Sequence, residues 1–162
     1  MRFIKLLAVA VIMLTVPFAM ASDYRPSGGS GGGGAGPAGP STLVFVGSSQ
    51  IPLSGSSTVY IGATASTVSA DVGIPATAET TFSTVAITLS VGPGTGKTWT
   101  ITVMKNNTAT TASSTITGNS TSVALTTDMP ALASGDTFSL KVVPAGTPAP
   151  TIINFTAQAV LN

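Results

Sequence analysis

Residues 91–103 read VGPGTGKTWTITV, and this stretch distinguishes two very different folds. Its first half, GPGTGKT, is similar to the phosphate-binding loop of nucleotide hydrolases, in which four residues separate the two glycines and a helix follows the lysine. Here three residues separate Gly92 from Gly96. The residues after Lys97 alternate between polar and apolar, which is the pattern of a half-buried strand. We therefore predict a glycine-rich turn between two antiparallel strands, and no nucleotide site.

The same two-residue period recurs along the chain from Thr42 onward. In the stretch that follows Asp136, for example, Phe138, Leu140 and Val142 share one face of an extended chain. No segment shows a sustained helical period. About eight short strands separated by turns predict an all-β fold, an antiparallel β-sandwich of the jelly-roll type. The predicted strands cover residues 43–46, 59–61, 81–91, 98–105, 114–118, 121–126, 136–143 and 151–161.

The first 21 residues have the three parts of an export signal. Arg2 and Lys5 precede an apolar run, and Ala19-Met20-Ala21 forms a cleavage site before Ser22. The apolar run is short for a membrane span. We therefore predict a secreted protein, extracellular or at the cell surface, with no stable membrane span after cleavage. Retention of the segment as an uncleaved anchor is the alternative.

Residues 22–41, SDYRPSGGSGGGGAGPAGPS, contain mainly Gly, Ser and Pro and predict a flexible arm rather than part of a core. Residues 36–41 form two collagen-type triplets, GPA and GPS. Two triplets are too few to hold a triple helix by themselves. The segment is therefore either a stiff linker or the stub of a stalk in which three chains run side by side. Residues 42–162 form the predicted β-sandwich domain.

Charged residues make up 7% of the chain, whereas ordinary soluble domains have roughly 25%. The predicted mature part has four basic and five acidic side chains, so it offers no electrostatic basis for binding nucleic acid. Thr and Ser supply most of the surface polarity. Hydroxyl groups keep a surface hydrated without charge repulsion between copies, so this composition favours packing of the protein against itself.

The sequence predicts neither an enzyme nor a cofactor. With no His and no Cys, imidazole bases, thiol nucleophiles and the usual zinc sites are ruled out. Acidic residues at predicted turns are typical of backbone capping, although Asp128 and Asp136 leave a calcium site open as an alternative. Trp99, Tyr60 and Phe82 are either core residues or a sugar-stacking platform. The alternation around Trp99 favours the core. We predict no catalytic, cofactor-binding or metal site.

Residues 92–108 (GPGTGKTWTITVMKNNT), a Thr/Ser-rich strand pair, residues 131–150 (ALASGDTFSLKVVPAGTPAP) and a final alternating strand follow one another in that order. This order resembles the C-terminal head domains of bacterial collagen-like surface proteins and phage fibre proteins, which are similar to the trimeric jelly roll of the complement C1q and tumour-necrosis-factor type. The resemblance covers roughly residues 42–162, and here the stalk is only a stub. It implies structural roles for Gly94, Gly96, Lys97, Asn106, Asn107, Gly135 and Asp136.

Leu43, Val44, Phe45 and Val46 form a short strand that is apolar on both faces. In an edge strand of a sandwich, the core covers the side chains on one face. Apolar side chains on the second face therefore need to be covered by something other than the core. We therefore predict that these four residues take part in assembly with copies of the same chain, as a trimer or a polymer. Either a neighbouring subunit covers the second face, or the strand is donated to a neighbour's sheet with the flexible arm as its tether. The predicted function is that of a self-assembling structural subunit of an extracellular fibre, coat or trimeric appendage. An adhesin or fibre tip that binds a glycan or cell-surface receptor is the alternative.

Overall fold

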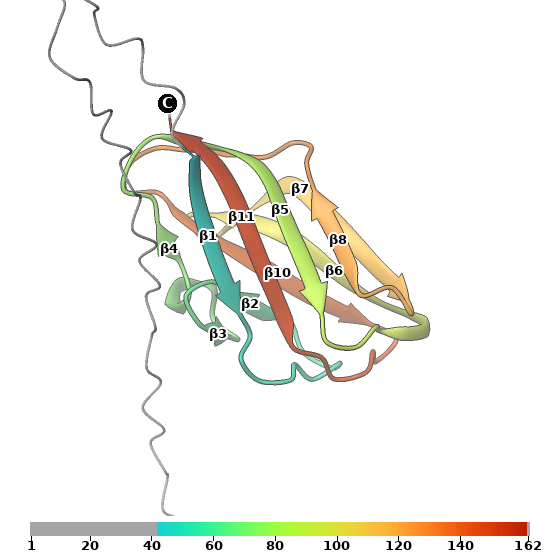
Figure 1. Cartoon of the computed structure of the whole chain (residues 1–162). Coiled ribbons are helices and arrows are strands. Elements are labelled where there is room, and N and C mark those ends of the chain that lie inside the picture. Colours follow the sequence, from blue (N-terminus) through green and yellow to red (C-terminus); the bar gives the residue numbers. More distant parts are fainter. Residues whose placement is uncertain (1–41, 162) are drawn as a thin grey trace, which may run out of the picture. The chain divides into compact units, whose positions relative to one another are not determined.

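The computed structural model describes residues 42–161, and the predictions about the export signal, the arm and the collagen-like triplets lie outside this range. The described chain is a two-sheet antiparallel β-sandwich (Figure 1). One 3₁₀ turn, at Ser69–Asp71, interrupts the strands. The strands are β1 (Thr42–Ser48), β2 (Val59–Ile61), β3 (Ala65–Ser66), β4 (Ile74–Pro75), β5 (Thr80–Leu89), β6 (Gly94–Lys105), β7 (Thr108–Gly118), β8 (Ser122–Leu125), β9 (Ala131–Leu132), β10 (Thr137–Ala145) and β11 (Ile153–Leu161).

The sheet that we call the β1 sheet has the order β1-β11-β5-β8, and β9 also pairs with β5. The second, which we call the β6 sheet, has the order β3-β2-β10-β6-β7, and β4 also pairs with β10. If only the strands of three residues or more are counted along the chain, the β1 sheet contains the first, eighth, third and sixth of them, in that spatial order. The second, seventh, fourth and fifth belong to the β6 sheet. This is the strand order of a jelly roll, which confirms the predicted fold class.

The glycine-rich segment between β5 and β6 does not join two paired strands, so this part of the prediction is wrong. Strand β5 lies in the β1 sheet and β6 in the β6 sheet. The chain crosses from one to the other at residues 90–93, and Gly94 to Lys97 already belong to β6. Gly94 and Gly96 have φ angles of 97° and 70°, which favour glycine. Alternation shows that a strand is half-buried, but it does not show which sheet the strand joins. The strand predicted after Lys97 is confirmed, because β6 continues there.

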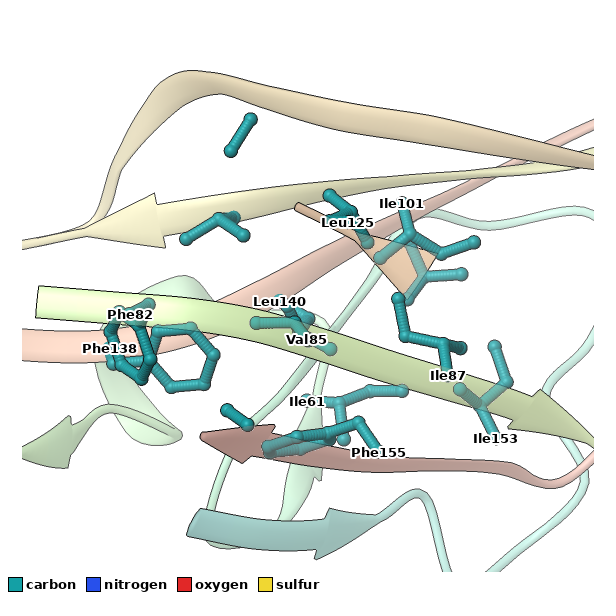
Figure 2. Close-up of a cluster of buried hydrophobic side chains, with 14 of the residues drawn as sticks. Ile61, Phe82, Val85, Ile87, Ile101, Leu125, Phe138, Leu140, Ile153 and Phe155 are labelled. Carbon is teal, nitrogen blue, oxygen red and sulfur yellow. The ribbon is translucent and has the colours of Figure 1, made fainter. Parts of the chain in front are cut away.

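The core fills the space between the sheets with the predicted inward faces. Trp99, Ile101 and Val103 of β6 are fully buried, which confirms the core position of Trp99. Figure 2 shows the rings of Phe82 and Phe138 side by side, and their centroids lie 4.6 Å apart. The indole Nε1 of Trp99 is buried with no hydrogen-bond partner among the described residues. The ring is therefore held by apolar packing alone.

Candidate assembly surface

The four residues predicted to take part in assembly lie in β1, at one border of the β1 sheet (Figure 1). Strand β1 pairs antiparallel with β11 in a regular register, from Thr42 opposite Val160 to Ser48 opposite Asn154. Within residues 42–161, β11 is the only strand next to β1. One border of the strand is therefore open in this part of the chain.

The alternating side chains of β1 divide the four residues between two environments. Leu43 and Phe45 are half-buried and pack against the core. The Phe45 ring lies 5.6 Å from the Phe82 ring, centroid to centroid. Val44 and Val46 point the other way and are 52% and 69% exposed, among the most exposed large apolar side chains of the described residues. The sandwich therefore covers one face of the strand and leaves two valines in solvent.

The backbone of β1 follows the same alternation. The N–H of Ser49 donates to the carbonyl of Ile153 at 2.8 Å, one residue beyond the Ser48–Asn154 pair, so Ser49 and Ile153 fall at a hydrogen-bonded position of the antiparallel pattern. Bonded and non-bonded pairs alternate, so Leu43, Phe45 and Gly47 bond to β11. The intervening residues direct their N–H and C=O groups toward the open border. Val44 and Val46 therefore present an exposed side chain and outward backbone groups together.

Within the described residues, strand β1 lacks the lysine, proline and β-bulge that commonly protect an open edge. Soluble proteins commonly block such edges with Lys, Pro or a β-bulge. The sequence TLVFVGS contains neither Lys nor Pro, and its register with β11 has no irregularity. The whole β1 sheet contains no Asp, Glu, Lys or Arg in its strands. All charged residues in described strands belong to the β6 sheet, and they are Lys97, Lys105 and Lys141.

The long edge of the β6 sheet is built differently. Strand β7 presents hydroxyl side chains, and these pair with hydroxyls on β6: Thr100 with Thr115 at 3.1 Å, and Thr102 with Ser113 at 3.0 Å. Its register with β6 shifts at two places. This edge is polar and irregular, so β1 is the border better suited to regular pairing with another strand.

A polar cluster at the β6–β7 turn joins Lys105, Asn106 and Asp136. The Lys105 ammonium lies 2.9 Å from one Asp136 carboxylate oxygen, and the Asn106 amide donates to the other at 2.7 Å. The hydrogen bond from Asn106, followed by those from Lys105 and the Ala133 N–H, lowers the pKa of Asp136 from 3.8 to about 2. An ionised carboxylate with both oxygens occupied suits a structural role, which is the role that the resemblance implies for Asn106 and Asp136.

The alternatives that involve ligands find little support in this geometry. No group of three or more acidic residues suited to a metal ion occurs among residues 42–161. The Lys105 ammonium is paired with the Asp136 carboxylate, so it would compete with a calcium ion for that carboxylate. Trp99 and Phe82 are buried, so they do not form a sugar-stacking platform with Tyr60, which is half-buried.

In the described part of the chain, no helix has the length and apolar character needed to cross a membrane. Comparison of the sequence with protein-family models and with curated proteins finds no match to either.

Proposed function

We propose that this protein is an exported structural protein whose β-sandwich domain is a self-assembling subunit of an extracellular fibre, coat or trimeric surface appendage. The observation that carries the proposal is the border of β1, where Val44 and Val46 are exposed beside outward-directed backbone groups. A long, flat, apolar edge strand is a template for pairing with another chain. In a protein that stays monomeric, such an edge would be a liability.

The absence of charged side chains from the strands of the β1 sheet supports the same proposal. Ordinary soluble proteins carry charges on both faces, which keep copies apart. Here the outward residues of the four main strands have hydroxyl, amide or aliphatic side chains. Two copies that approach through this sheet meet no like-charge repulsion between strand residues. The jelly-roll strand order also accords with the resemblance to trimeric heads, although jelly rolls serve many functions.

The test is the assembly state of the predicted mature chain, residues 22–162. We expect light scattering and electron microscopy to show oligomers or filaments at micromolar concentrations. Deletion of residues 22–46, which removes the arm and most of β1, should abolish them. The matched deletion of residues 22–41 removes the arm and keeps β1. Circular dichroism and thermal melting report whether each truncated chain still folds.

A mature chain that is monomeric at every concentration would overturn the proposal. Oligomers that survive deletion of residues 22–46 would also contradict the assignment of assembly to β1. Loss of assembly on deletion of residues 22–41 alone would instead place the contact in the arm.

A further inference from the structure

We infer that two copies of this chain pair through β1 in one specific antiparallel register, with Phe45 on the two-fold axis, so that the β1 sheets of both copies become one continuous sheet. This inference rests on the proposed function, because it names the contact through which self-assembly begins. It follows from two features of β1. The first is which residues direct their backbone N–H and C=O groups toward the open border, and the second is the pattern of the side chains.

The backbone phase restricts the possible registers. The residues whose N–H and C=O groups point to the open border are Thr42, Val44, Val46 and Ser48. In an antiparallel pair, two opposed residues exchange hydrogen bonds only when both point toward the partner. Residues of this set must therefore face residues of the same set in the second copy. A shift by one residue would leave these groups unpaired.

The side chains select one of the allowed registers. With Phe45 on the axis, Val44 faces Val46 of the second copy and Thr42 faces Ser48. This arrangement forms about eight inter-chain hydrogen bonds, because each of four opposed pairs exchanges two. It also gathers the four exposed valines on one face and matches hydroxyl residues with hydroxyl residues. Sliding the strands by two residues in either direction pairs a valine with Thr42 or Ser48 instead.

The inner face accommodates the same register. Leu43 would lie opposite Gly47 of the second copy, and glycine leaves room for the leucine side chain. Gly47 has to be glycine for a reason within one copy, because a Cβ there would come within 2.4 Å of Phe155 Cε1 and 2.7 Å of the Gly62 carbonyl oxygen. The half-buried Phe45 ring would meet its equivalent across the axis, where opposed residues of a non-bonded pair approach to about 4.5 Å between Cα atoms. The partner would thus cover the ring's exposed part.

A second copy fits this border better than the other segments available. Residues 22–41 contain Pro26, Pro37 and Pro40 and many glycines, which are poor residues for a hydrogen-bonded strand. The edge at β7 carries hydroxyl side chains and an irregular register. Within the predicted mature chain, residues 22–162, only β1 carries two valines separated by one residue, which is the spacing that the valines of β1 require.

The chain contains no cysteine, so single-cysteine variants report this register directly. Purified Val44→Cys and Val46→Cys proteins are mixed in equal amounts and oxidised mildly, and the disulfide-linked dimers are separated by mass after an isotope label marks one protein. In the inferred register, residues 44 and 46 face each other within disulfide reach. Residues 44 and 44, or 46 and 46, lie on a diagonal of about 7–8 Å, beyond the usual limit for a disulfide. The control is Ala86→Cys, which is exposed on the same sheet but two strands away from the border.

We expect the mixed 44–46 dimer to dominate, and the Ala86→Cys control to form only background dimer. A dominant 44–44 or 46–46 dimer would overturn the register. If the mature chain is oligomeric by light scattering while both β1 cysteines cross-link no better than Ala86→Cys, pairing through β1 is wrong and the proposed self-assembly stands. If the mature chain is monomeric by mass, the proposed function itself fails.

Discussion

The inner faces of the two sheets pack against each other in one core, but the outer faces and edges of the two sheets carry different side chains. The β6 sheet carries all the lysines found in described strands, and its edge strand β7 engages hydroxyl side chains with β6. The β1 sheet has no charged residue in its strands and ends in an edge with two exposed valines. The β6 sheet thus has the charged and hydroxyl side chains of a solvated surface, whereas the strands of the β1 sheet lack the charged side chains that oppose association between copies. Stability and assembly should therefore respond to different residues.

The largest expected effect is on stability, from the centre of the β6 sheet. Trp99→Ala removes a fully buried indole, and such deletions cost about 3–5 kcal/mol in the free energy of unfolding. That loss is a large share of the stability of a typical domain. Chemical denaturation of the wild type and the variant measures it. An unchanged midpoint would contradict the core position of Trp99.

Trp99→Phe serves as the matched variant. It keeps an aromatic ring and removes the indole N–H, which has no hydrogen-bond partner among the described residues. An unpaired buried donor costs about 1–3 kcal/mol, so its removal offsets part of the packing loss. We expect Trp99→Phe to be clearly more stable than Trp99→Ala. If the two variants have the same denaturation midpoint, the aromatic ring contributes little packing energy.

The sequence predicted this interior well because side-chain alternation records which face of a strand is buried. All eight predicted strands are present, and Phe138, Leu140 and Val142 lie in the core as expected. Strands β3, β4 and β9 were missed because two residues are too short to show a period. The pairing of β5 was mispredicted because alternation says nothing about which sheet a strand joins.

The candidate assembly surface was predictable only in part. The run Leu43–Val46 identified a strand that is apolar on both faces, since that property is local. Its position at a border and the lack of charge across the whole β1 sheet depend on β11, β5 and β8, which are distant in the chain. Tertiary pairing, which a single sequence does not reveal, therefore determines which valines are open to solvent.

The second prediction separates assembly from stability at the border of β1. The double variant Val44→Lys with Val46→Lys places charges on exposed positions, so the free energy of unfolding should change by no more than about 0.5 kcal/mol. Assembly should be lost, because lysines on an edge strand repel a second copy and prevent pairing. Light scattering measures assembly, and thermal melting measures stability.

The control for this variant lies on the other sheet. Thr117→Lys adds a charge at an exposed position of β7, the edge of the β6 sheet. It should leave the oligomers intact. If Thr117→Lys dissociates the oligomers and the β1 variant does not, the roles of the two sheets are the reverse of those proposed.

The smallest expected effect concerns the ion pair at the end of the β6 sheet. The pKa of Asp136 is lowered from 3.8 to about 2 by hydrogen bonds from Asn106, Lys105 and the Ala133 N–H. A carboxyl group with a lowered folded-state pKa contributes stability above its unfolded-state pKa, and this contribution disappears as the pH falls through the folded-state value. The contribution of Asp136 is therefore present above about pH 4 and lost toward pH 2. Asp136→Asn removes the ionisable group, so its melting temperature should lie below that of the wild type at pH 5 and approach it at pH 2.

Asp128→Asn is the control, because Asp128 is an exposed acid at a turn outside this cluster, and its φ of 55° is one that asparagine tolerates. It removes the same charge without touching Lys105. A melting difference between wild type and Asp136→Asn that persists unchanged from pH 5 to pH 2 would show that Asp136 acts through its shape rather than its charge. Asp136→Asn should also assemble normally at neutral pH, because no ionisable side chain lies in the strands of the β1 sheet. Loss of assembly in this variant would place a charged contact between copies and remove the distinction between the two sheets.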